Sequence, residues 1–502
     1  MTLQITQIPD STPVTYIGTS NTANFPAATN RTPILPITVK QTSDISSLFK
    51  VKFILRVYDG AVDPANLLCV LKQRPNNFSK TTNSVAIFDV RGIINSILSF
   101  TNADTGATSA ASEVHKIGSN VNTKIFSTNT STVQTIVFKA SYEYAASATV
   151  APIEQTGGGD IVQFTGYFLP STFPLYTSIT TNPFNDYVAV DSSALFLTNT
   201  PSITDYRHRN LAIGGASVLS GYINYVSKTT DFQTFGFLNF WSSDPEFMAL
   251  KYYNSIGSQV GSTYTFENTS TQGGEDPASA NQDSEYLLFG GVGPANLEGY
   301  NGACFKGGAA TTNFDGEPSI VGDWAYYELY LCASDDGTNR RTTSYYFVKD
   351  GTTDNNCKGQ NIVRLGWINS FGAWDYFNFK GGQVETIQTD RKNYKQILGS
   401  TSLESLSSYE YYKYEGGNQT LYTTAKKTAT LETQFIEQEE AQFLENLFNS
   451  PTVMIIDKGD ITTTQRVLIT NKSMEKKTKD KNRIQIQYTF DIEYSNPINT
   501  IS

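Results

Sequence analysis

Short runs in which apolar and polar residues alternate dominate the chain. In residues 49–58 (FKVKFILRVY) every second side chain is apolar, while Lys50, Lys52 and Arg56 occupy positions between them. This period of two is typical of a strand with one buried and one solvated face. The run therefore predicts a strand, with residues 67–72 as a second strand that could pair with it. The apolar positions expected to face a core are Phe49, Val51, Phe53, Leu55 and Val57.

Similar runs recur through the middle and the last part of the chain. Clusters of Asn, Gly, Asp and Ser separate them, which is the turn chemistry and spacing of a β-sandwich. No internal repeat of fixed period is present. The runs predicted as strands are residues 221–227, 234–241, 247–253 and 326–332 in the middle, and 452–457, 465–470 and 483–494 at the end.

Two segments have helical spacing instead. Residues 91–100 carry Ile93, Ile94, Ile97 and Leu98, with Asp89 as the expected N-cap. Residues 434–449 begin with charged and amide side chains, and Thr433 is the expected cap. The apolar stripe of this second helix is predicted to be Phe443, Leu444, Leu447 and Phe448, and Ser450 and Pro451 end it.

The chain is long enough for several domains, and its fold class is predicted to be mainly β: several β-sandwich-like domains with one or two short helices. The glycine run at residues 157–159 marks one expected boundary. We predict a β-rich assembly domain over 1–155, a β-sandwich over 160–380 and a β domain with one helix over 381–502. Residues 101–132, rich in Ser, Thr, Asn and Ala, are predicted to form a long surface excursion.

The composition agrees with a protein of strands and turns, and it argues against some classes of binding partner. Aromatic residues make up 13% of the chain and charged residues only 17%. A net charge of −10 argues against a nucleic-acid partner, which needs a basic face. The basic run from Lys472 to Arg483 has no interleaved aromatic residues and is expected to be a solvated hairpin tip. No apolar run approaches the length of a membrane span, so membrane insertion is not expected.

The four cysteines give no metal or disulfide signature. They lie far apart with no CxxC pair, and the opening residues MTLQITQIPD do not resemble a secretory leader. Cys304, Cys332 and Cys357 lie in one region and could pair or pack. Buried free thiols are the favoured interpretation, and their disulfide state stays open.

No catalytic or cofactor site is expected. The only histidines are His115 and His208, so most triads and zinc sites lack their usual ligand or base. A glycosidase needs only two carboxylates and is therefore considered separately. Its candidates are Glu275, Asp276, Asp283, Glu285 and Asp375, most of them in polar loops where acidic residues are usually solvated. Residues 334–339 (SDDGTN) and 350–355 (DGTTDN) resemble calcium loops, but their spacing favours hairpin turns.

The most distinctive local feature is the aromatic segment of residues 364–379 (RLGWINSFGAWDYFNF). Core strands around a turn at Asn369 and Gly372 are the favoured interpretation, because so much ring surface is costly to expose. A sugar-stacking platform or a subunit contact is the alternative. The residues that would form it are Trp367, Phe371, Trp374 and Tyr376.

Three motifs together resemble those of tail-associated virion structural proteins of tailed bacteriophages that infect marine bacteria and Bacteroidetes. These motifs are IFDVRGIINSIL, RLGWINSFGAWDYFNF and the closing LENLFNSPTVMII with VLITNKSMEKKTKDKNRIQIQYTFDIEYSNP. The resemblance implies a structural role in the virion, after assembly in the host cytoplasm, with no catalytic residues to carry over.

The expected partners are copies of the chain in a symmetric ring or cluster and other virion proteins, with a host surface glycan as a further candidate. A capsid decoration or portal-adjacent protein, or a lectin-like module, is the alternative function.

Overall fold

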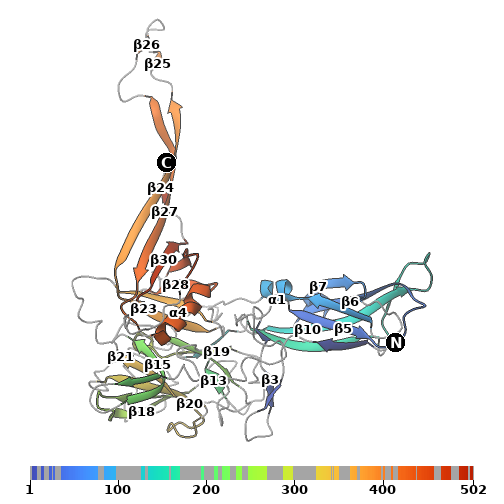
Figure 1. Cartoon of the computed structure of the whole chain (residues 1–502), viewed down its shortest axis with the longest axis horizontal. Helices are drawn as coiled ribbons and strands as arrows, with labels where there is room; N and C mark the ends of the chain where they lie inside the picture. Colours follow the sequence, from blue (N-terminus) through green and yellow to red (C-terminus); the bar gives the residue numbers. More distant parts are fainter. Residues whose placement is uncertain are drawn as a thin grey trace. The chain divides into compact units, whose positions relative to one another are not determined.

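The computed structural model is mainly β, as the sequence predicts, with mostly antiparallel strand pairings and short helices (Figure 1). The chain divides into two compact units, Met1–Asp354 with Ile368–Asp375, and Asn355–Trp367 with Tyr376–Ser502. The structure describes residues 3–7, 13–15, 22–24, 27–28, 35–76, 84–97, 126–129, 134–157, 160–169, 194–196, 209–212, 218–226, 233–239, 247–267, 287–297, 324–340, 342, 344–349, 362–369, 373–396, 400–401, 409–410, 416–436, 438–456, 465–475, 486–495 and 498–500.

Two sheets near the start of the first unit share one core. The first has the order β1 (Leu3–Gln7), β5 (Pro36–Gln41), β8 (Ser84–Asp89). The second has the order β4 (Ala27–Ala28), β12 (Val162–Leu169), β10 (Gln134–Ala145), β6 (Phe49–Asp59), β7 (Leu67–Gln73), with β11 (Ile153–Gln155) on β10. Buried side chains from both sheets and from α1 (Arg91–Ile97) form one cluster, including Ile37, Val39, Phe53, Phe138 and Ile94. The 3-10 helix η1 (Pro64–Asn66) precedes β7, and β2 (Pro13–Thr15) pairs with β3 (Thr22–Asn24).

The strand predicted over residues 49–58 is confirmed, and so is its pairing with the strand after it. Phe53, Leu55 and Val57 are buried in the core as expected. Phe49 is 46% exposed, so its predicted core position is wrong; it begins the strand beside Lys50, whose φ is 54°. Asp89 acts one residue before the helix cap, because its Oδ1 accepts from the backbone N–H groups of Arg91 and Leu35.

Two further sheets lie in the first unit. One has the order β13 (Ala194–Phe196), β16 (Thr234–Asn239), β19 (Leu287–Gly291), β9 (Phe126–Asn129). The other has the order β14 (Arg209–Ala212), β15 (Val218–Val226), β21 (Tyr345–Lys349), β20 (Tyr326–Cys332), β17 (Phe247–Tyr253), β18 (Gln259–Glu267). One cluster of buried side chains includes Phe235 of β16, Leu250 of β17 and Leu297 of α2 (Pro294–Leu297). All four strands predicted in this region are present.

The largest sheet lies mainly in the second unit. Its order is β23 (Trp374–Phe379), β22 (Val363–Ile368), β28 (Val453–Ile456), β29 (Gln465–Ile469), β30 (Thr489–Tyr494), β27 (Gly417–Glu432), β24 (Gln383–Gln396), with β31 (Ile498–Thr500) on β27. The helix α4 (Gln438–Asn449) packs on it, with Leu444 and Leu447 fully buried beside Val453 and Phe490. Separately, β25 (Ser400–Thr401) pairs with β26 (Tyr409–Glu410).

The apolar stripe predicted for α4 is confirmed, but its predicted cap is wrong. The Thr433 hydroxyl accepts a hydrogen bond from the backbone N–H of Tyr488, so it joins the chain to a distant segment. Ile436 also bridges Ile486, which keeps this part of the chain extended. The helix therefore begins at Gln438, later than the sequence predicts.

At three places, strands pair across a boundary that the sequence pattern predicts. β12 follows the glycine run at residues 157–159 and pairs with β10, so the sheet that contains β6 and β10 continues past this run. β9 lies within the predicted surface excursion and pairs with β19, which corrects that prediction for residues 126–129. β22 and β23 belong to the largest sheet, which therefore begins before residue 381. Strand pairing depends on distant partners, which a local pattern does not identify.

Candidate assembly surface

The aromatic segment singled out in the sequence is interior. Trp367 is 0% exposed, and Trp374 and Tyr376 are each 1% exposed. The ring of Trp367 lies 4.9 Å from that of Phe443 on α4, and the Arg364 guanidinium lies 4.9 Å from the Tyr376 ring. Rings buried in this way leave no face on which a sugar could stack. The alternative prediction of a sugar-stacking platform is therefore wrong for these three residues. Phe371 lies outside the described residues.

The turn of this segment forms as expected at its first residue. The backbone N–H of Asn369 donates to the carbonyl of Ala373 at 2.8 Å, and the Asn369 side chain accepts the N–H of Ala373 at 3.1 Å. Asp375, the one glycosidase candidate that the structure describes, is fully buried. The remaining polar candidates lie outside the described residues: His115, His208, Glu275, Asp276, Asp283, Glu285, residues 350–355 and most of the basic run that ends at Arg483.

The calcium-loop and cysteine candidates that the structure describes have structural roles. Residues 334–339 form a turn in which the Asp336 carboxylate accepts the N–H of Thr338 at 2.9 Å. Cys332 is a buried free thiol, and burial raises its pKa to about 11. Cys304 and Cys357 lie outside the described residues. Within the described part of the chain, no group of His, Cys, Asp and Glu could hold a metal ion, and no helix is long and apolar enough to cross a membrane.

The feature that stands out is a long two-stranded arm formed by β24 and β27. The strands pair in antiparallel register from Gln383 opposite Leu431 to Gln396 opposite Gly417. At about 3.3 Å per residue, the 14 residues of β24 span roughly 46 Å. β30 supports β27 only over residues 428–432, and β31 supports it over 423–425. Beyond these pairings the two strands extend as a ribbon (Figure 1).

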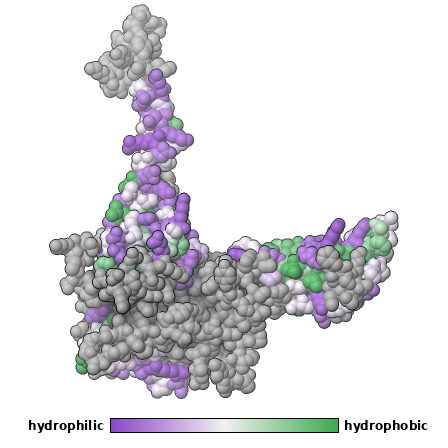
Figure 2. Space-filling view, in the orientation of Figure 1, coloured by the Kyte–Doolittle hydropathy of each residue, from purple (hydrophilic) through white to green (hydrophobic). Residues whose placement is uncertain are grey.

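The β24 strand of the arm is exposed along almost its whole length. Every residue of β24 after Gln383 is exposed, including Val384 at 63% and Ile387 at 60%. In the strand order of the described residues, β24 is an edge strand with no neighbour opposite β27. Figure 2 shows the arm as mainly hydrophilic with isolated apolar positions. A free strand edge of this length can pair with another chain.

The base of the arm is held by side chains. Lys427 Nζ lies 2.9 Å from Glu385 Oε1, and the Tyr494 hydroxyl donates to the same oxygen at 3.0 Å. The hydrogen bond from Lys427 lowers the pKa of Glu385, whereas burial raises the pKa of Tyr494 to about 12. Lys426 pairs with Glu493 at 2.5 Å on the other face. These contacts position the root of β24 and leave its outer edge open.

A second polar network lies in the sheet that contains β20. The Glu328 carboxylate is almost fully buried, and it accepts from the Tyr253 hydroxyl at 2.9 Å and lies 2.8 Å from Arg340 Nη1. The Ser344 hydroxyl donates to it as well. Burial alone would raise the pKa of Glu328, but these partners outweigh it and hold that pKa below its ordinary value. The arrangement satisfies a buried charge and is best explained as structural.

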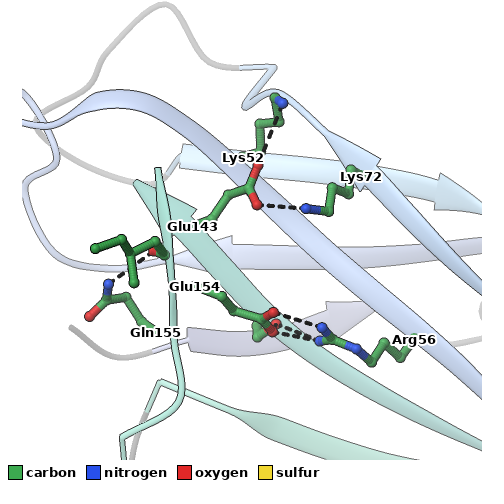
Figure 3. A network of polar contacts seen from close by, with 8 residues as sticks. Lys52, Arg56, Lys72, Glu143, Glu154 and Gln155 are labelled. Carbon is green, nitrogen blue, oxygen red and sulfur yellow. Dashed lines mark hydrogen bonds and ion pairs between the residues drawn. The ribbon is translucent and has the colours of Figure 1, made fainter. Parts of the chain in front are cut away.

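A third network lies on the charged face of the sheet that contains β6 and β10 (Figure 3). Glu143 of β10 accepts from Lys72 at 2.6 Å and lies 3.5 Å from Lys52. Nearby, Glu154 of β11 forms a pair with Arg56. The cations come from β6 and β7, so the side chains join four strands across their solvated face. Their groups are paired with one another, and this network is also structural.

The sequence analysis did not single out the arm. The β24 sequence QVETIQTDRKNYKQ has only three apolar residues, Val384, Ile387 and Tyr394, and no period of two among them. Its strand-forming Thr residues and its charges are the signal that could have indicated an exposed edge strand. A scan against protein-family models finds no match for the chain, and a search of the curated proteins finds none either.

Proposed function

We propose that this chain is a structural subunit of a tailed-bacteriophage virion, located in the tail or baseplate region, that makes contacts between subunits and catalyses no reaction. The observation that carries the proposal is the exposed arm of β24 and β27. A two-stranded ribbon gains little stability from its own contacts in water. Its exposed edge gains more when another subunit covers it, as happens in an assembled particle.

The rest of the described chain supports the same role. The aromatic rings of Trp367, Trp374 and Tyr376 are buried in the interior. The carboxylates of Glu328 and Asp375 are also buried, and that of Glu328 accepts a hydrogen bond from Tyr253. The sequence resemblance to tail-associated virion proteins is the reason for proposing a phage particle, and the exposed arm is the surface proposed for assembly.

The test is to find the chain in purified particles. Mass spectrometry should detect it in the virion of the phage that encodes it, and cryo-electron microscopy should place it in the tail. Density in the capsid would favour the decoration alternative. Absence from the particle would overturn the proposal.

A shortened arm provides a functional test. Replacing residues 392–422 by Asn-Gly closes the hairpin after the pair Arg391–Thr423, with a turn suited to two-residue hairpins. This variant should fold, because the contacts of β27 with β30 and β31 remain. We expect far fewer copies to enter particles. Normal incorporation would show that the distal arm plays no part in assembly.

A further inference from the structure

We propose that the partner of the arm is a second copy of this chain, joined by antiparallel pairing of the two β24 edges about a two-fold axis at Gln388. This inference rests on the proposed assembly function and names the partner of residues 384–392, the part of β24 near the root of the arm that the shortened variant largely keeps. The first ground is the open edge, since β24 has a strand on only one side among the described residues. A second β24 would extend the sheet without moving any described strand.

Charge complementarity selects a copy of the same strand. A two-fold axis normal to the sheet keeps each side chain on its own face, and directly opposite residues share a face. A residue therefore pairs with the residue equally far from the axis on the other side, so the two residue numbers add to twice the number at the axis. With the axis at Gln388, Glu385 of each copy lies opposite Arg391 of the other. Both ion pairs form at once, and Thr386 lies opposite Asp390.

Both partners have capacity for this contact. The contacts of Glu385 with Lys427, Tyr494 and Gln383 all reach its Oε1, and its Oε2 has no partner among the described residues. The Glu385 side chain is 43% exposed. The Arg391 side chain is exposed and has no hydrogen bond or ion pair to any described residue. An unpaired guanidinium and a free carboxylate oxygen on one edge are therefore complementary to their own copies.

Neighbouring registers are less favourable. An axis at Thr389 places Ile387 opposite Arg391 and forms no ion pair. An axis at Asp390 pairs Glu385 with Lys395, and an axis at Arg391 pairs Asp390 with Lys392. Each of these axes also places the charge on the axis directly opposite its own copy, and like charges in this position are destabilising. The charge order of β24 thus favours one register.

The expected contact is small. A ladder over residues 384–392 covers roughly 300 Å² of each copy, if each residue covers its ~3.3 Å rise times a ribbon depth of about 10 Å. This is well below the ~800 Å² per partner of a standard interface, so we expect a weak pair in solution. Many copies held together in a particle would strengthen it.

Sedimentation equilibrium of the full-length chain, from about 1 to 300 µM at low salt, tests the pairing. We expect a reversible dimer with a Kd in the micromolar range, on the order of 100 µM. Arg391→Glu should weaken it about 10-fold, because it creates two like-charge pairs. Lys395→Glu makes the same change in net charge on the same strand but lies beyond the ladder, and should change the Kd by less than about threefold.

Mixing two variants isolates the proposed contact. Arg391→Glu presents two carboxylates on its edge, and Glu385→Arg presents two guanidinium groups, so each alone should pair poorly with itself. Together they should form a heterodimer with a Kd within about threefold of the wild-type value, since both ion pairs are restored, one with its original polarity and one with its polarity reversed. Circular dichroism of each variant checks that it is folded.

A wild-type chain that remains monomeric at 300 µM would overturn the inference, as would equal effects of Arg391→Glu and Lys395→Glu or a mixture that does not associate. Binding of the arm to a different virion protein, with no self-association, would overturn it too. These results leave the proposed function standing, because that is scored separately by the presence of the chain in particles.

Discussion

Arg56 on β6 and Glu154 on β11 form a two-pronged ion pair, in which the Arg56 Nη1 and Nη2 atoms lie 2.5 and 2.7 Å from the two carboxylate oxygens of Glu154 (Figure 3). The hydroxyl of Ser141, on β10 between them, donates to the same carboxylate. The planar guanidinium fits this geometry, which a lysine ammonium does not reproduce. The pair therefore joins β6 and β11 through side chains across β10.

Substituting Glu154 by Gln tests this pair through its pH dependence. The hydrogen bond from Arg56 lowers the pKa of Glu154, so its stabilising effect is full above the ordinary glutamate pKa of ~4.3 and fades as pH falls through the lowered value. At pH 7 we expect the variant to lose about 1 kcal/mol of unfolding free energy, since both side chains are about a quarter exposed. Urea unfolding should show this difference narrowing below about pH 4. A difference independent of pH would contradict the ionic explanation.

The stripe of α4 gives a prediction for stability. Leu444 is fully buried between the helix and the largest sheet, so Leu444→Ala removes buried methyl groups and leaves a cavity. We expect a loss of about 2–5 kcal/mol in the unfolding free energy of the second unit. Asn449→Ala, at the exposed last residue of the helix, is the control and should change it by less than about 0.5 kcal/mol. Equal effects in thermal unfolding would refute the packing of α4.

Two glycines should respond in opposite directions to Ala. Gly92 lies in α1, and no atom of the other described residues lies within 4 Å of the position of an added Cβ, so Gly92→Ala should stabilise by about 0.5–1 kcal/mol through helix propensity. At Gly381 the added Cβ would lie 2.5 Å from the backbone carbonyl oxygen of Glu432, which must then move. Gly381→Ala should lower the midpoint of urea unfolding and Gly92→Ala should raise it. The same direction of change for both would contradict the described backbone.

Gln41 provides a test of a buried amide. It is 1% exposed at the end of β5, and neither its side-chain oxygen nor its nitrogen has a hydrogen-bond partner among the described residues. Burying such a group without a partner costs about 1–3 kcal/mol, so Gln41→Leu should leave stability unchanged or raise it by up to that amount. Differential scanning calorimetry measures the shift. A marked fall in the unfolding temperature would show that the amide is hydrogen-bonded in solution.

Much of the local structure follows from the sequence. β6, β17 and β20 lie where alternating residues predict strands, and the stripe containing Leu444 and Leu447 identifies α4. The burial of the aromatic segment also follows, because exposed rings are costly. Each of these features depends on the order of side chains within a few residues, which sets the face of a strand or helix that can be buried.

Tertiary structure decided the rest. Ile54 is fully buried on the face that also carries Lys52 and Arg56, and β9 pairs with β19 from another part of the chain. The Thr433 hydroxyl is used by Tyr488 rather than by the helix it precedes. β24 is an exposed edge only because the other described strands take the remaining places in its sheet. A local pattern fixes which side chains share a face, whereas pairing depends on distant strands competing for the same backbone groups, and only the folded chain settles that competition.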